Sequence, residues 1–106
     1  MYATDVDTEY ARRLGDALRA ALSYRSRETS DLAAHLGVDP ETVRRWQRGD
    51  HGMSNAHAAA AAAYLNAPGD LFIRPPETWG EAMAMMGAWD ELQARQSARQ
   101  PGPSRP

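Results

Sequence analysis

Apolar side chains recur every three or four positions over most of this chain, and that spacing predicts helices. Between Tyr10 and Leu22 the apolar residues fall on one face of a helix. Runs that alternate apolar and polar residues are absent, and the 106 residues include only three Val and one Ile. The sequence therefore predicts an all-α protein without a sheet.

Residues that start and stop helices divide the chain further. A second helix is expected to begin near Thr29 or Ser30, whose hydroxyl groups can cap backbone N–H groups, and to stop at Gly37. Asp39 followed by Pro40 is a strong start for a third helix, because proline lacks only an N–H group that has no partner at that position anyway. Two short helices are thus expected close together.

Later segments carry boundary signals of the same kind. They predict an end of the third helix at Gly49 and a fourth helix that Ser54 or Asn55 caps and that runs to Leu65. Residues 67–72 are expected to form a turn and a one-turn fifth helix, and a sixth helix is expected from a capping box at Thr78 and Glu81 to about residue 98. The expected fold is a five-helix bundle followed by an amphipathic C-terminal helix.

Prolines mark the expected organisation of the chain. Arg74-Pro75-Pro76 cannot continue a helix, so a hinge is expected there. The expected segments are a flexible N-terminus at 1–8, a helix-turn-helix domain at 9–73, a proline-rich hinge at 74–77, a C-terminal helix at 78–98 and a disordered tail at 99–106. The length suits one small globular domain.

Charge limits the partners that such a chain can attract. Fourteen acidic and twelve basic residues give a net charge of −2, so no global positive field draws the protein to nucleic acid or to a membrane. Residues 10–48 nevertheless carry eight Arg against five acidic residues, a local excess of three positive charges. No stretch approaches the roughly 20 apolar residues of a membrane span, and Cys is absent. We therefore expect a cytoplasmic protein without membrane contact.

The range 29–49 has the anatomy of a helix-turn-helix. Its two short helices meet at Gly37, which permits a sharp turn, and Ala33 supplies a small side chain where the helices cross. Val43 and Trp46 are expected to point inward from the second of these helices. This packing would hold the angle between the helices and project the remaining face of the second one.

Arginine dominates that projecting face. Its outward positions are Pro40, Glu41, Arg44, Arg45 and Arg48. An α-helix fits the major groove of B-DNA, where Arg bonds guanine O6 and N7 together and Glu accepts from the cytosine amino group. The pattern is typical of sequence reading, with a solvated, solubilising face as the plainer alternative. If carboxylates within the molecule tied these guanidinium groups down, or another segment covered them, the interpretation of DNA reading would fail.

From position 14 to 72 the chain resembles the lambda-repressor-like DNA-binding domains, also called the Cro/C1 or XRE type. The resemblance rests on Leu14-Gly15-x-x-Leu18-Arg19, Leu32-Ala33-x-x-Leu36-Gly37-Val38, Val43-x-x-Trp46-x-x-Gly49 and Leu65-Asn66-Ala67-Pro68-Gly69-Asp70-Leu71-Phe72. It implies a DNA-binding domain that binds two half-sites as a dimer. It also implies Thr29 at the phosphate or groove edge, Pro40, Glu41, Arg44 and Arg45 in the major groove, and Arg48, Ser54 and Asn55 near phosphate.

The predicted C-terminal helix has an apolar face too wide for a solvated helix. Trp79, Met83, Met86 and Trp89 belong to it. This face could pack within the monomer, form a seam between two copies, or hold a protein partner. We expect dimerisation.

Catalysis, metal binding and cofactor binding are not expected. His35, His51 and His57 have no spacing that places two of them on one helix face, and no Cys accompanies them. No Ser has a suggestive His and Asp nearby, and no glycine-rich loop could cradle phosphate.

The sequence thus predicts a cytoplasmic, sequence-specific regulator of transcription, a repressor that binds double-stranded DNA as a homodimer and reads the major groove with residues 39–48. The alternative is a protein-interaction module, such as an antitoxin or an anti-regulator. It would keep the helix-turn-helix scaffold and bind its partner through the Trp and Met side chains of the C-terminal helix. The acidic pI of about 5.9 favours this alternative.

Overall fold

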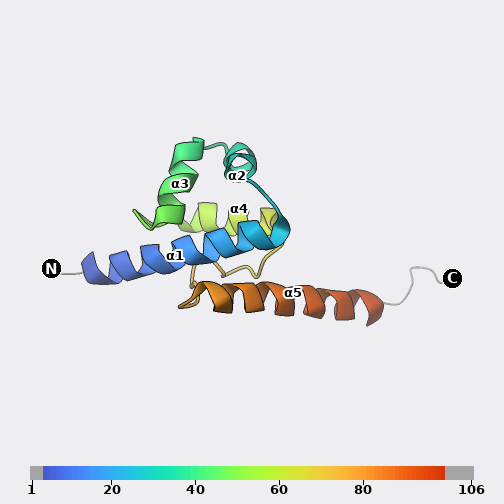
Figure 1. Ribbon diagram of the computed structural model, residues 1–106. Coiled ribbons are helices and arrows are strands. Elements are labelled where there is room, and N and C mark those ends of the chain that lie inside the picture. The colour runs from blue at the N-terminus through green and yellow to red at the C-terminus, as the bar shows by residue number, and fades with distance from the viewer. Residues whose placement is uncertain (1–3, 100–106) are drawn as a thin grey trace.

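The computed structural model describes residues 4–99, and all of the regular structure in that range is helical (Figure 1). The helices are α1 (Thr4–Arg25), α2 (Thr29–Leu36), α3 (Pro40–Arg48), α4 (Asn55–Tyr64) and α5 (Trp79–Arg99). No strand occurs among the described residues, which confirms the predicted all-α class.

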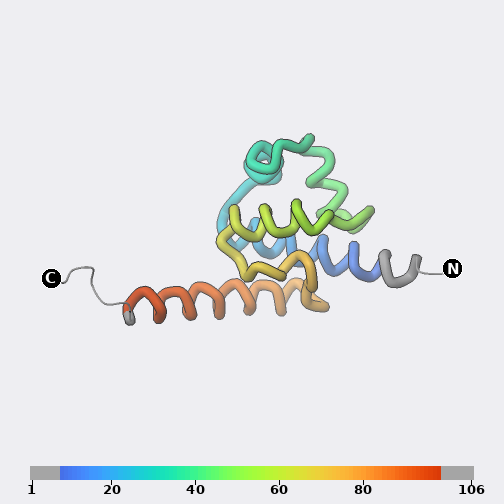
Figure 2. The backbone as a smooth tube through the Cα atoms, turned by 180° about the vertical axis from the view of Figure 1, so that it is seen from behind, coloured from blue at the N-terminus to red at the C-terminus, as the bar shows by residue number. Residues whose placement is uncertain are grey.

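Helix α1 lies at the centre of the molecule, with α2, α3 and α4 on one side and α5 along the other (Figures 1 and 2). Helices α1 and α5 run side by side in the same direction, and α5 extends past the C-terminal end of α1 (Figure 1). None of the helices described here is long and apolar enough to cross a membrane.

One hydrophobic core joins all five helices. Its largest fully buried side chains are Leu14 and Leu18 of α1, Leu32 of α2, Val43 of α3, Met86 of α5, and Leu65, Leu71 and Phe72 of the segment between α4 and α5. Helix α4 contributes only alanines to this core, which lets its backbone approach its neighbours closely.

The predicted caps around the helix-turn-helix are present. Gly37 follows α2 with φ of +71°, a left-handed conformation that glycine adopts without steric cost. The Asp39 carboxylate accepts from the Glu41 backbone N–H at 2.8 Å, and Pro40 occupies the first helical position. The start of α2 differs slightly, since Glu28 rather than Thr29 is its N-cap and donates its backbone N–H to the Asp31 carboxylate at 3.1 Å.

Helix α3 crosses α1 at Gly15. A Cβ atom at this position would lie 2.7 Å from the Gln47 carbonyl oxygen and 3.0 Å from that of Trp46. Real Cβ atoms do not approach backbone so closely, so only glycine fits at this crossing. The C-terminal half of α3 therefore rests directly on the backbone of α1.

Two terminal predictions and one internal prediction need correction. Helix α1 begins at Thr4, so residues 4–8 are not a flexible leader, and residues 1–3 lie outside the described range. Helix α5 continues to Arg99, and the remaining predicted tail, 100–106, also lies outside that range. The one-turn helix predicted within 67–72 is absent, and this segment forms hydrogen-bonded turns instead. These turns place the adjacent side chains of Leu71 and Phe72 in the core.

The predicted separation of the C-terminal helix from the bundle by a hinge is wrong. Pro75 is buried, and α5 packs along α1 with Ala82 and Met86 in the common core. The reason is that α1 buries more than the face recognised from sequence: Ala20, which lies outside that face, is also fully buried. Part of the wide apolar stripe of α5 is covered in this way, while Trp79 and Leu92 stay exposed.

Arg25, the last residue of α1, fastens α5 to the bundle. Its guanidinium donates to both carboxylate oxygens of Asp90, at 2.7 and 2.5 Å, and to the carbonyl oxygens of Leu65 and Asn66, each at 2.7 Å. The pKa of Asp90 is lowered, chiefly by the hydrogen bond from Arg25. A single side chain thus joins α1, the turn after α4 and α5.

Candidate nucleic-acid interface

Helix α3 is anchored on one side and open on the other. Val43 is fully buried and Trp46 is 2% exposed, while the side chains between them face outward. The indole of Trp46 lies against the His57 ring of α4, with the ring centroids 5.5 Å apart. Together with the contact at Gly15, this packing gives α3 a fixed orientation on the bundle.

All eight residues predicted to contact DNA are exposed or half-buried. They are Thr29 at the start of α2, Pro40, Glu41, Arg44, Arg45 and Arg48 on α3, and Ser54 and Asn55 at the start of α4. The structure brings the four charged residues of α3 into contact with one another. Among the described side chains, no hydrogen bond or ion pair joins Ser54 or Asn55 to them.

One carboxylate lies among the three arginines of α3. Glu41 Oε2 accepts from Arg48 Nη2 at 2.9 Å and lies 3.9 Å from Arg45 Nε, while Oε1 accepts from Arg44 Nη1 at 3.5 Å. We call these four residues the α3 charge cluster. Its members occupy positions i, i+3, i+4 and i+7, which follow one face of a helix.

A second carboxylate reaches the same cluster. Asp50 Oδ2, just beyond the end of α3, accepts from Arg48 Nε at 3.1 Å. The pKa of Glu41 is lowered, first by the hydrogen bond from Arg48, and the pKa of Arg48 is raised by its bonds to Glu41 and Asp50. The Glu41 carboxylate therefore stays ionised at neutral pH.

The predicted positive patch is consequently weaker than the count of arginines indicates. Three Arg are balanced by Asp39, Glu41 and Asp50, so residues 39–50 carry no net charge. The guanidinium side chains nonetheless remain 51% to 56% exposed. Ion pairs this exposed contribute little to stability and exchange readily for other partners, so they do not lock the arginines in place.

Gln47 and Arg19 also lie beside the cluster, although the sequence did not indicate them as site residues. Thr29 donates its hydroxyl to Gln47 Oε1 at 3.1 Å, which links the start of α2 to the outer side of α3. Arg19 of α1 donates to the Gln47 carbonyl oxygen at 3.2 Å and pairs with Asp16. An open hollow is lined by Arg19, Arg44, Gln47, Arg48 and Asp50. Gln47 lies three residues after Arg44, and this helical spacing could have indicated that the two side chains lie side by side on α3.

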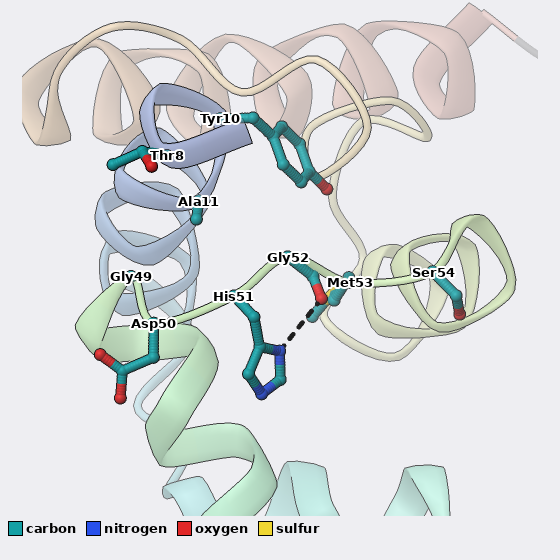
Figure 3. A pocket seen from close by; sticks show the side chains of 9 residues that line it. All are labelled: Thr8, Tyr10, Ala11, Gly49, Asp50, His51, Gly52, Met53 and Ser54. Atoms are coloured by element: carbon teal, nitrogen blue, oxygen red, sulfur yellow. Dashed lines mark hydrogen bonds between the residues drawn. The ribbon is translucent and has the colours of Figure 1, made fainter. Parts of the chain in front are cut away.

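A different hollow lies between the N-terminal part of α1 and the loop at 49–54 (Figure 3). Two of its polar side chains already serve the fold. The Tyr10 hydroxyl donates to the Phe72 carbonyl oxygen at 2.7 Å, and the Ser54 hydroxyl accepts from the His57 backbone N–H at 3.1 Å. Burial raises the pKa of Tyr10. Ser54 is thus a helix cap, as predicted, with its own O–H still able to donate.

The predicted dimer residues of α5 fall into different environments. Met86 is fully buried in the monomer and cannot face a partner, which corrects its assignment. Met83 is half-buried against the core, and Trp89 donates its indole N–H to Asn66 Oδ1 at 3.3 Å. Trp79 is 44% exposed. Besides Trp79, the apolar residues left at the surface include a shallow groove formed by Pro68, Met85, Ala88, Trp89 and Leu92, which we call the α5 groove.

No group of three or more His, Cys, Asp or Glu residues within the described part of the chain could hold a metal ion. Comparison with known proteins adds no further constraint: no family model, no curated protein and no solved structure matches this chain. The geometry of the α3 surface is therefore the main guide to function.

Proposed function

We propose that this protein is a sequence-specific, double-stranded DNA-binding regulator of the lambda-repressor-like helix-turn-helix type, acting as a transcriptional repressor. The observation that carries the proposal is the rigid seating of α3. Val43 and Trp46 anchor one side of the helix, and three half-exposed arginines occupy the other. A helix presented in this way can enter the major groove and offer guanidinium groups to guanine.

The internal ion pairs are compatible with this role. Each guanidinium has five N–H donors in a planar fork, and the contacts to Glu41 and Asp50 occupy only some of them. Phosphate oxygens and guanine acceptors can take over these donors when DNA approaches, because the pairs are exposed to solvent. A protein that acts on DNA in this way is proposed to work in the cytoplasm.

The test is fluorescence anisotropy with duplex DNA selected from a random pool. The variant Arg44→Ala, Arg45→Ala, Arg48→Ala is compared with a control, Arg13→Ala, Arg74→Ala, Arg95→Ala, whose positions lie away from α3. Both triple variants lower the net charge by three. A difference between them therefore reports where the arginines lie and not how much charge is lost.

We expect the α3 variant to bind at least about 100-fold more weakly than wild type, because phosphate and base contacts are both lost. The control is expected to stay within about threefold of wild type, as distant charges are screened. Equal losses in the two triple variants would refute reading by α3.

The proposal includes a homodimer that binds two half-sites. The two copies are proposed to contact each other through the α5 groove. Leu92 is 43% exposed, so Leu92→Glu leaves the fold intact while it places a charge in the groove. Light scattering should then report a dimer for wild type and a monomer for the variant. A wild-type monomer would instead favour the second candidate function, a protein-interaction module that uses this groove.

A further inference from the structure

Glu41 occupies a position that its local role in α3 does not explain. An acidic residue in the first turn usually serves the free N–H groups and the positive end of the helix dipole. Here Asp39 already caps the helix and accepts from the backbone N–H of Glu41 itself. The Glu41 carboxylate points the other way along the helix, toward Arg48 two turns further on.

This carboxylate also lies on the surface proposed to meet DNA. Its side chain is 47% exposed, similar to the arginines around it. When those arginines move to phosphate or to guanine, Glu41 loses its partners and faces a polyanion. An unpaired carboxylate in a contact with like charges is strongly unfavourable. The cost falls on every DNA sequence that supplies no replacement donor.

We propose that Glu41 is a specificity-determining residue of the α3 surface. It serves as the internal counter-ion of the three arginines when DNA is absent, and it weakens binding to all duplexes except those that present a cytosine amino group at the N-terminal end of α3. This inference rests on the proposed function. The cytosine amino group is the donor that matches a carboxylate in the major groove, so the favoured site pairs such a cytosine with guanines for the arginines.

Asp50, which contacts the α3 charge cluster from outside α3, provides a matched control. It also accepts from Arg48, at 3.1 Å, but it lies past Gly49, beyond the C-terminal end of the reading helix. Asp50→Asn therefore frees Arg48 and removes one negative charge, as Glu41→Gln does. Only Glu41→Gln removes the carboxylate from the end of α3 that is proposed to meet the bases. Both substitutions are nearly isosteric and lie on exposed side chains, so both variants are expected to fold.

The experiment has two readouts for wild type, Glu41→Gln and Asp50→Asn. The first is affinity for a fixed duplex outside the selected motif, measured over a range of salt concentrations. We expect Glu41→Gln to bind this duplex about tenfold more tightly than wild type, because one like charge leaves the interface. The second readout is selection from random duplexes, in which Glu41→Gln should lose the preference for cytosine at one position. Asp50→Asn should keep the wild-type motif.

Three results would overturn the inference, and they are distinguishable. Unchanged non-specific affinity and an unchanged motif for Glu41→Gln, with normal wild-type binding, would remove the role of Glu41 and leave the proposed function standing. Loss of the same cytosine preference in Asp50→Asn would show that total charge sets the preference. Absence of duplex binding by wild type and by both variants would remove the proposed function and this inference together.

Discussion

Two surfaces of this protein look alike in sequence and behave differently in the structure. Both α3 and α5 are amphipathic helices whose sequence predicts a binding surface. In α3 that surface consists of arginines, and in α5 it consists of Trp and Met side chains. The apolar stripe of α5 packs mainly within the monomer, where Ala82 and Met86 are buried in the core. The charged face of α3 stays outside, with its arginines paired to Glu41 at the surface.

The difference follows from what each face costs to expose. Apolar surface gains free energy wherever it is buried, so an available apolar side of α1 is enough to cover α5. Charged side chains lose hydration when they are buried, so they pair with each other and remain in water. A wide apolar stripe therefore indicates packing before it indicates a partner, whereas a charged face on a well-anchored helix remains available for one.

The largest effect is expected from Met86→Ala, which tests whether α5 belongs to the monomer. Removing a fully buried Met side chain should lower the free energy of unfolding by about 3 kcal/mol. Urea titrations at low and high protein concentration measure this loss. The same loss is expected at both concentrations, because the contact lies within one chain. A loss that depends on concentration would place Met86 between two copies instead.

A slightly smaller effect is expected from Gly15→Ala, which tests the seat of α3. The new Cβ would meet the Gln47 carbonyl at 2.7 Å, so α3 must shift on α1, at a cost of about 2 kcal/mol. Gly37→Ala is the matched control: its Cβ meets nothing within 4 Å, and only the positive φ opposes it, at about 1 kcal/mol. Thermal unfolding would rank the two. A Gly37 variant less stable than the Gly15 variant would contradict the close crossing.

The smallest effect is expected from Asp90→Asn, which loosens the C-terminal part of α5. Loss of the pair with Arg25 should lower stability by about 1 kcal/mol at pH 7. Because Arg25 lowers the pKa of Asp90 in the folded state, this contribution is complete above the ordinary Asp pKa of about 3.9 and disappears as the pH falls through the folded value.

Thermal melts across pH 2 to 7 would measure this. The difference between wild type and Asp90→Asn should shrink below about pH 4. Hydrogen bonds from Arg12 and then Arg13 lower the pKa of Glu9 to about 2, and because Asp90→Asn does not alter these contacts, their contribution should cancel in the difference between the two proteins. A difference in stability that stays constant with pH would contradict the role of the Asp90 carboxylate.

Local chemistry made much of the fold predictable. Asp39 before Pro40, Gly37 after α2, Ser54 before the alanine run and Thr78 before α5 each act within a few residues, so the sequence states them directly. The side of α1 that carries Ala20 was hidden, because alanine carries little hydrophobic signal. The packing of α5 on that side was therefore missed.

In the candidate site, too, local features could be predicted and contacts between distant segments could not. The outward direction of the α3 arginines follows from helical spacing and was predicted. The spacing of Glu41 from Arg44, Arg45 and Arg48 also permits their ion pairs, although only the folded geometry shows how close they are. Contacts between distant segments had no signal in a single sequence, as Thr29 with Gln47 illustrates.

The dependence of DNA affinity on salt tests most directly whether the outer face of α3 is the interface. Each arginine that contacts phosphate releases a counterion from DNA and steepens the slope of log affinity against log salt by about 0.9. Arg48 is the arginine expected at phosphate, whereas Arg44 and Arg45 are expected at bases, so replacing all three by Ala should flatten the wild-type slope by about one. A slope that is the same for wild type and this triple variant would contradict the account.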